Sequence, residues 1–300
     1  MRIGFVGLGT MGYPMATNLL ASGHQLFLWG RNPAKFEDLL AQGAQRCASP
    51  AALASEVEVV GLCLTDTAAV QQVVFGEEGL ASGLQPGAIL VDCSSIDPAA
   101  TRAFAQRLIT ECDCAWLDAP VSGGVKGADA GTLTIMAGGE ESAFECAAPF
   151  FDAIGKRRTL VGASGSGQIA KACNQLIIGA SLNGIAEALK VAAASGLNPE
   201  LIPDTLQDGW ADSPLLQGHG RRMAGMLNKM PEEDQGMGIS KGLMVKDMQI
   251  ALDQGAQAGV EMPVTRLVAD RYREVLAKGL PEHGQVGIVQ LDWAGENKGE

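Results

Sequence analysis

Short apolar runs alternate with longer amphipathic stretches over roughly the first 160 residues of the chain. The runs have the length of strands buried in a parallel sheet, and the stretches between them have helical spacing. This alternation predicts an α/β fold with a doubly wound, mainly parallel sheet, whose ligands lie beyond the carboxyl ends of the strands. The predicted strands cover residues 3–6, Gln25–Trp29, Val57–Cys63, Ala88–Asp92, Ala115–Asp118 and Leu133–Ala137.

After the glycine-rich segment Gly162–Gly167, strand signals nearly vanish and helical patterns dominate. We therefore predict a first domain over residues 1–163 and an all-helical domain over residues 164–300. Gln168–Ala194 lacks proline and is apolar all round, which predicts one long helix buried on most of its surface, partly against another subunit. Further helices are predicted over Pro199–Gln207, Gly242–Gly259 and Pro263–Lys278, with a polar loop at Lys229–Gly236 and a frayed tail at Gly295–Glu300.

Three glycines follow the first predicted strand and precede a helix. Gly7, Gly9 and Gly12 fit the G-x-G-x-x-G pattern, in which the glycines allow a tight turn, close approach of pyrophosphate, and packing of helix on strand. The amino end of the helix then faces the phosphates. The alternative is a plain structural turn. The predicted cofactor-binding residues of this turn are Gly7, Leu8, Gly9, Thr10, Met11 and Gly12.

The loop after the second predicted strand indicates which dinucleotide binds. An acidic residue here would bind the ribose hydroxyls of NAD, but the loop carries Arg31 and Asn32 instead. The Arg31 guanidinium suits a 2′-phosphate, so NADP is favoured, with NAD still possible. The competing interpretation is an exposed arginine, with Asn32 only capping the helix that Pro33 begins.

Other polar or glycine-rich segments also follow predicted strands. Leu64 and Thr65, Ser95, and the loop around Ser122 occupy such positions, where a nicotinamide ring and its substrate would lie. In that loop, the Ser122 hydroxyl and the backbone N–H groups at Gly123 could hold a carboxylate without a full positive charge. The alternative is an ordinary glycine turn after a strand.

The composition restricts the class of partner and the compartment. A formal net charge of −12 argues against nucleic acid as a general partner. The seven cysteines are odd in number and scattered, which predicts reduced thiols, and no cysteine or histidine spacing predicts a metal site. No signal-like or membrane-length apolar segment opens the chain, so we expect a cytoplasmic protein.

Lys171 is the candidate for moving a proton. It lies one turn into the long predicted helix, with Asn174 and Gln175 three and four residues later, so all three side chains can face one cleft. Hydride transfer to a carbonyl needs such a proton donor, together with an anchor for the rest of the substrate. The alternative is a snorkelling surface lysine.

Four motifs together resemble the β-hydroxyacid dehydrogenase family, which includes 3-hydroxyisobutyrate dehydrogenase, tartronate semialdehyde reductase and the glyoxylate/succinic semialdehyde reductases. They are Gly7–Gly12, Asp118–Gly124, Gly167 through Lys171 to Asn174, and Lys246-Asp247. The resemblance implies a Rossmann domain followed by a helical domain, assembled as a homodimer or homotetramer. It also implies a nicotinamide-dependent oxidoreductase that interconverts a small β-hydroxyacid and its semialdehyde.

The resemblance also implies roles for single residues. Lys171 would be the general acid–base residue, and Leu64, Ser95 and Lys246 would line the nicotinamide end. Substrate would be bound by Ser122, Gly123, Gly124, Asn174 and Gln175. The chain departs from its relatives at Gly30-Arg31-Asn32, where NADP-using relatives often have Asn-Arg-Thr, and near Ile239 and Gly242.

Two other functions stay open. One is an NADPH-dependent imine reductase, which shares the architecture but generally lacks a lysine at the position of Lys171. The other is a non-catalytic NADP-binding scaffold protein, which would have no need of Lys171, Asn174 and Ser122 together.

Overall fold

The computed structural model describes residues 1–228, 242–279 and 281–291. The chain divides into two compact units, Met1–Lys171 and Ala172–Glu300, which are described separately below. The predicted loop Lys229–Gly236 and the predicted tail Gly295–Glu300 lie outside the described residues. The boundary predicted at 163/164, where strand signals end after a glycine-rich segment, stays a prediction of which residues bind the cofactor and which contribute to substrate binding and assembly.

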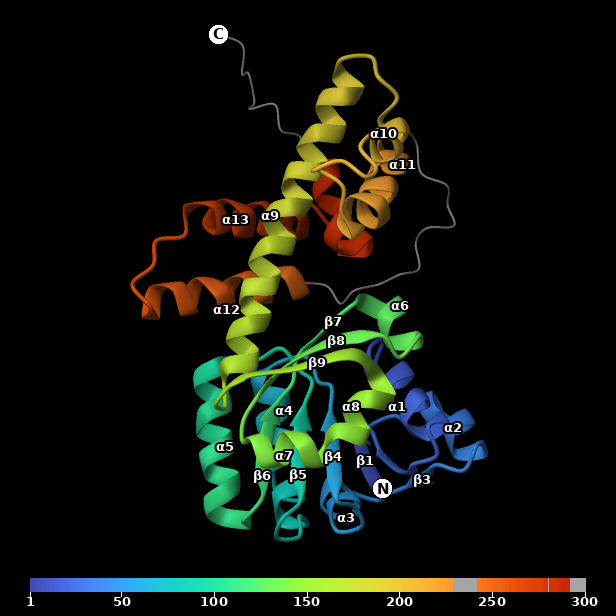
Figure 1. Ribbon diagram of the computed structural model, residues 1–300, viewed down its shortest axis with the longest axis vertical. Helices are drawn as coiled ribbons and strands as arrows, with labels where there is room; N and C mark the ends of the chain where they lie inside the picture. The colour runs from blue at the N-terminus through green and yellow to red at the C-terminus, as the bar shows by residue number, and fades with distance from the viewer. Residues whose placement is uncertain (229–241, 280, 292–300) are drawn as a thin grey trace. The chain divides into compact units, whose positions relative to one another are not determined.

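The first unit is built on a mainly parallel sheet, as the alternating pattern predicts (Figure 1). In the described chain it has nine strands in the order β3-β2-β1-β4-β5-β6-β8-β7, with β9 on β8; the pairs β6–β8 and β7–β8 are antiparallel. The short strand β3, the two-residue β7 and the exposed β9 lack an apolar run, so the pattern missed them. The strands are β1 Arg2–Val6, β2 Gln25–Trp29, β3 Gln45–Arg46, β4 Val59–Leu62, β5 Ile89–Asp92, β6 Ala115–Asp118, β7 Val121–Ser122, β8 Leu133–Gly138 and β9 Gly155–Gly162.

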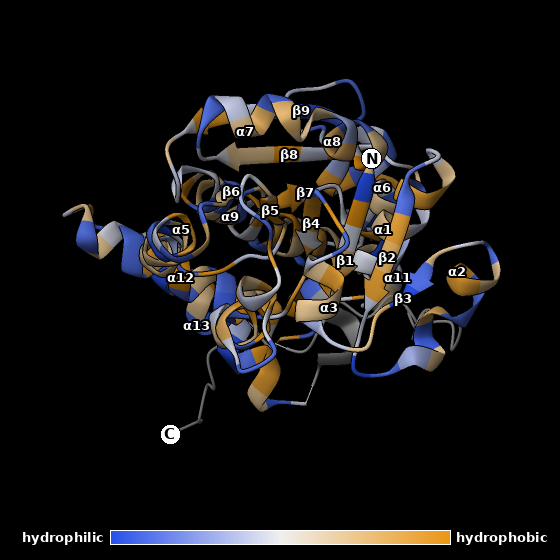
Figure 2. Ribbon diagram, turned by 90° about the horizontal axis from the view of Figure 1, so that it is seen from below, coloured by the Kyte–Doolittle hydropathy of each residue, from blue (hydrophilic) through white to orange (hydrophobic). Residues whose placement is uncertain are grey.

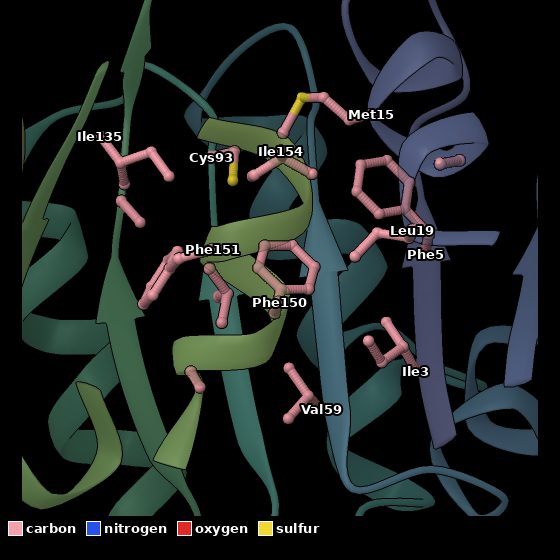
Figure 3. Close-up of a cluster of buried hydrophobic side chains, with 14 of the residues drawn as sticks. Ile3, Phe5, Met15, Leu19, Val59, Cys93, Ile135, Phe150, Phe151 and Ile154 are labelled. Carbon is pink, nitrogen blue, oxygen red and sulfur yellow. The ribbon is translucent and has the colours of Figure 1, made fainter. Parts of the chain in front are cut away.

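Helices cover both faces of this sheet, because neighbouring residues of each buried strand point to opposite sides. Val59 packs with the α1 and α8 side chains on one face, and Val60 packs with α4 and α5 on the other. Figure 3 shows the first cluster, where Phe150 and Phe151 of α8 lie against the sheet. The helices are α1 Gly12–Ala21, α2 Glu37–Ala41, α3 Pro50–Ala54, α4 Thr67–Phe75, α5 Pro98–Cys112, α6 Gly124–Asp129, α7 Glu141–Cys146 and α8 Ala148–Ile154. In Figure 2 the inner strands β2 and β4 are coloured mostly as apolar, as burial on both faces requires.

The regular elements in the described part of the second unit are all helices. Its core joins Leu182 of α9, Met223 of α11, Met248 of α12 and Tyr272 of α13. The predicted helix at 199–207 is instead a 3₁₀ turn, Pro199–Leu201, followed by a single α turn, and α11 was not predicted. The elements are α9 Ser166–Ala194, which starts in the first unit, α10 Ile202–Thr205, a π-helical turn at Leu216–Gly220, α11 Arg221–Leu227, α12 Leu243–Gln257, α13 Pro263–Ala277 and a 3₁₀ helix at Pro281–Gln290.

Helix α9 is less buried than its apolar sequence predicts. In the single chain, one third of its most apolar 18-residue window is buried, and Ile177 and Val191 are 68% and 64% exposed. The single chain therefore does not itself bury most of this helix, and burial against another subunit stays a prediction. Among the described helices, α9 is the one with the length and composition of a membrane span, but core helices pass the same test and Leu182 and Leu189 are fully buried.

Candidate active site

The glycine turn has the conformation that a dinucleotide-binding turn requires. Gly7 has φ +98°, and a Cβ there would lie 2.2 Å from the Cys63 carbonyl oxygen. A Cβ on Gly12 would lie 2.0 Å from the Gly7 carbonyl oxygen, so α1 packs directly on the turn. At Gly9, in contrast, a Cβ would meet nothing within 4 Å. Gly7 and Gly12 are thus required by the fold, while Gly9 leaves space above the turn.

This arrangement fits the pyrophosphate of a nicotinamide dinucleotide. The Gly9 N–H donates to the Gly7 carbonyl at 2.9 Å, which closes the turn, and α1 begins at Gly12 with no side-chain cap on its first N–H groups. Thr10 is exposed, whereas Leu8 and Met11 pack partly against the core. Backbone N–H groups at the start of a helix are the usual donors to phosphate.

The loop after β2 presents Arg31 as the sequence predicts. Arg31 is exposed, and the Asn32 side chain accepts a hydrogen bond from the Ala34 N–H at 3.2 Å. Asn32 therefore caps the 3₁₀ turn Pro33–Phe36. The Asn32 side chain is thus used as a cap, and the Arg31 guanidinium is exposed beside it.

The loops after β4 and β5 are joined by Ser94. The Leu64 N–H donates to Ser94 Oγ at 2.8 Å, and the Ser94 N–H donates to Asp92 Oδ1 at 2.9 Å. The predicted residues Leu64 and Ser95 are thereby brought to neighbouring positions. Thr65 instead is exposed, and its hydroxyl donates to Asp66 Oδ2 at 2.8 Å.

Gln168, which sequence reasoning missed as a site residue, connects these loops to α9. Its Nε2 donates to the Ser94 carbonyl at 2.8 Å, and its Oε1 accepts from the Ile96 N–H at 3.1 Å. The side chain is buried, so both bonds are made away from water. Its position three residues before Lys171 was the available signal, because i and i+3 lie on the same side of a helix.

Asp118 holds the amino end of α9 in place and was also missed. Its carboxylate accepts from the Gly165 N–H at 2.8 Å and from the Gln168 N–H at 3.0 Å. Burial raises the pKa of Asp118 to about 6, although the backbone donors act in the opposite direction. Gly138 and Gly167 make room for it, since a Cβ on either would lie within 2.9 Å of a carboxylate oxygen.

Lys171 is anchored on the loop that contains the predicted substrate anchors. Its Nζ donates to the Val121 carbonyl at 2.9 Å, and the side chain is half-buried. The next residues are Ser122, Gly123 and Gly124, and the two glycines have φ +140° and +62°. These conformations turn the backbone from β7 into α6. The structure thus brings Lys171 to Val121, the neighbour of Ser122, across 50 residues of sequence.

The remaining predicted residues belong to the second unit and form a chain of contacts. Asn174 Nδ2 donates to Gln175 Oε1 at 2.9 Å, and Gln175 Nε2 donates to Asp247 Oδ2 at 2.6 Å. Asp247 Oδ1 lies 3.2 Å from Lys246 Nζ. Gln175 is 4% exposed, which places it behind Asn174.

Comparison with protein families agrees with this architecture. Residues 2–181 match the model described as the NAD binding domain of 6-phosphogluconate dehydrogenase. Residues 165–291 match the model described as NAD-binding of NADP-dependent 3-hydroxyisobutyrate dehydrogenase.

Two relatives resemble the chain over almost its whole length. The 2-hydroxy-3-oxopropionate reductase of Escherichia coli is 36% identical over 97% of this chain and 96% of its own. The NAD-dependent L-serine dehydrogenase of Pseudomonas aeruginosa is 33% identical over 96% of each.

Solved structures show the same fold. The 3-hydroxyisobutyrate dehydrogenase of Salmonella typhimurium superposes with a TM-score of 0.85 and 26% identity, over 97% of this chain and 99% of that one. Psf3 in complex with NADP+ and 2-OPP gives a TM-score of 0.85 and 26% identity, over 96% and 99%. The chain belongs to the β-hydroxyacid dehydrogenase family and is an NAD(P)-dependent oxidoreductase that interconverts a hydroxyacid and its semialdehyde.

Proposed function

We propose that the protein uses NADP to interconvert a small β-hydroxyacid and its semialdehyde, with Lys171 as the general acid–base residue. The observation that carries this proposal is the contact of Lys171 Nζ with the Val121 carbonyl, immediately before Ser122. It holds an ammonium group next to a loop able to bind a carboxylate, instead of leaving it in solvent.

The residues have distinct tasks in this reaction. Bound NADP supplies or accepts the hydride at its nicotinamide ring. Lys171 gives a proton to the oxygen that becomes the alcohol, or removes it in the reverse direction. Ser122 and the backbone N–H groups of Gly123 and Gly124 hold the substrate carboxylate, and Asn174 holds a second polar group of the substrate. Leu64, Thr65, Ser95 and Lys246 border the nicotinamide.

Substitution of Lys171 tests the mechanism. We expect Lys171→Ala to lower kcat by about 10²- to 10⁴-fold, because a positioned acid–base group contributes that much. The dissociation constant of NADPH, measured by fluorescence titration, should change little. Lys190→Ala is the matched control, because Lys190 lies on the same helix and also donates to a backbone carbonyl, that of Leu291. Equal kcat values for the Lys171 and Lys190 variants would remove the mechanism.

The preference for NADP is supported by Arg31 in the loop after β2 and by the family model described as NADP-dependent. The L-serine dehydrogenase relative is named as NAD-dependent, so the cofactor differs within the family. Steady-state kinetics with both cofactors decides the matter, and a lower KM for NADH than for NADPH would contradict the proposal.

The substrate is best identified with a panel. Glyoxylate, succinic semialdehyde, tartronate semialdehyde, 3-hydroxyisobutyrate and serine each combine a carboxylate with a reactive carbonyl or hydroxyl group. A cyclic imine belongs in the same panel, because a Streptomyces aurantiacus imine reductase shares the fold, with a TM-score of 0.65 at 23% identity. Reduction of the imine without turnover of any hydroxyacid or semialdehyde would favour that alternative, and no turnover at all would favour a scaffold protein.

We also propose a cytoplasmic homo-oligomer in which residues 1–163 bind the cofactor and residues 164–300 contribute to substrate binding and assembly. Assembly is supported by exposed apolar side chains on α9 and α13. They are Ile177, Val191, Val264 and Leu267.

A further inference from the structure

The motif Lys246-Asp247 contains a carboxylate that the proposed reaction does not use directly. Asp247 is 4% exposed, and its carboxylate contacts Gln175 through Oδ2 and Lys246 through Oδ1. A buried carboxylate is costly unless it is paired and hydrogen-bonded, so the two contacts account for its presence inside the second unit. They do not by themselves account for the choice of an acid at this position.

The chemistry of these contacts decides which group of the Gln175 amide faces Asp247. An ionised carboxylate can only accept hydrogen bonds, and the Lys246 ammonium at 3.2 Å compensates its charge. Gln175 must therefore turn its amino group toward Asp247, where the N···O distance is 2.6 Å. Its carbonyl oxygen is then fixed on the opposite side of the amide, where it accepts from Asn174 Nδ2 at 2.9 Å.

We propose that Asp247 is a positioning residue that sets the orientation of the Asn174 carboxamide through Gln175. With the Asn174 amino group directed to Gln175, the carbonyl group of the same amide is directed the other way. Asp247 thus decides whether the substrate meets a donor or an acceptor at Asn174. This inference rests on the proposed substrate-binding role of Asn174, and we call the chain Asn174–Gln175–Asp247 the amide relay.

The position of Asn174 on the same side of α9 as Lys171 explains why the orientation of its amide matters. Asn174 lies three residues after Lys171 in α9, so the two side chains lie on the same side of the helix. An asparagine that is free to flip presents a donor in one orientation and an acceptor in the other. Fixing one orientation of the amide prevents a mismatched contact with the substrate. The hydroxyl and carbonyl forms of the substrate differ in the hydrogen bonds they make.

The experiment compares Gln175→Met, Asp247→Asn and the double variant. Gln175→Met keeps the volume and the Lys246–Asp247 pair but removes the relay. We expect the KM for the hydroxyacid to rise about tenfold, the effect of one lost hydrogen bond, with the NADPH dissociation constant within about twofold. Asp247→Asn offers both a donor and an acceptor to Gln175, and we expect its substrate KM to rise as well. The double variant should be no worse than Gln175→Met alone, because without Gln175 the residue at 247 has no path to Asn174.

Asn183→Leu is the matched control. Asn183 is another buried amide on α9, and its Nδ2 donates to the Gly179 carbonyl within the helix, outside the relay. We expect Asn183→Leu to lower the thermal stability about as much as Gln175→Met does, but to leave the substrate KM unchanged. A substrate KM of Gln175→Met equal to that of the wild type, or strictly additive effects in the double variant, would overturn the relay. Turnover by the wild type would still support the proposed function in that case. A wild type without turnover would instead remove the proposed function. If Asp247→Asn does not fold, Gln175→Met decides alone.

Discussion

Individual glycines in the opening turn have different tasks, as the G-x-G-x-x-G pattern predicts. Gly7 and Gly12 lie against backbone carbonyl oxygens, whereas a side chain at Gly9 would extend into open space. The spacing of the motif follows from backbone geometry, so it is readable in the sequence. The structure adds the partners: the carbonyl oxygen of Cys63, after β4, lies against Gly7, and that of Gly7 lies against Gly12 at the start of α1.

Substituting two of these glycines by alanine separates the two tasks. We expect Gly9→Ala to fold with nearly unchanged stability but to bind NADPH at least about tenfold more weakly, because the methyl group occupies the approach of the phosphates. Gly12→Ala should lower the free energy of unfolding by about 1–3 kcal/mol, because its Cβ must displace the Gly7 carbonyl. Urea unfolding and fluorescence titration measure both effects. The interpretation fails if Gly9→Ala binds NADPH like the wild type.

Arg31 provides the corresponding test of cofactor choice. We expect Arg31→Ala to raise the KM for NADPH by about 10- to 100-fold, as the loss of a charge-assisted hydrogen bond predicts, and to leave the KM for NADH nearly unchanged. Arg2→Ala is a suitable control, because Arg2 is exposed at the start of β1, away from the carboxyl ends of the strands. An equal rise of both KM values would show that Arg31 does not contact the 2′-phosphate.

Helix α9 is the element on which the site depends. Its amino end is fixed by Asp118, and Gln168 joins its first turn to the loop after β5. The bounds of the helix were predicted to within two residues, because a long apolar stretch without proline has few alternatives to a helical conformation. Its attachment was not predicted, because Asp118 and Gln168 are 50 residues apart in the sequence.

The cap at Asp118 gives stability a characteristic pH dependence. Because burial raises the pKa of Asp118 to about 6 in the folded chain, the folded state binds a proton more readily than the unfolded one. The contribution of Asp118 to stability is therefore fully present below about pH 4 and decreases as the pH rises to about 6. The shift from 3.8 to about 6 corresponds to about 3 kcal/mol.

Asp118→Asn isolates this effect, because an amide does not titrate. We expect the difference in free energy of unfolding, wild type minus Asp118→Asn, to fall by up to about 3 kcal/mol between pH 4 and pH 7. Urea unfolding at several pH values measures it. A difference that stays constant, or that grows with pH, would show that Asp118 titrates as an ordinary carboxyl or is stabilised in its charged form.

The described helical part of the chain leaves apolar side chains exposed. Val260, Val264 and Leu267 are each more than half exposed and recur at helical spacing at the start of α13 and just before it. Buried surface between copies of the chain would remove this exposure, which supports the proposed homo-oligomer. The net charge of −12 favours solubility without opposing a local apolar contact.

Assembly can be measured directly by light scattering coupled to size-exclusion chromatography. We expect a mass that is a multiple of the 31.1 kDa of one chain, and a smaller mass or weaker association for Val264→Asp. Glu261→Lys, which also changes a charge at the start of this segment, serves as a control for charge alone. A monomer at micromolar concentration would contradict the proposal.

The sequence by itself determined the features that depend on neighbouring residues: the glycine turn, the strands β2 and β6 with their observed bounds, and the long helix α9. Backbone conformation and hydrophobic periodicity act over a few residues, so they are visible in the order of amino acids. Only the tertiary structure decided that Lys171 contacts Val121, that Asp118 caps α9, and that Gln175 meets Asp247. These partners lie 50 to 72 residues apart, and their meeting depends on how strands and helices pack, which no local pattern encodes.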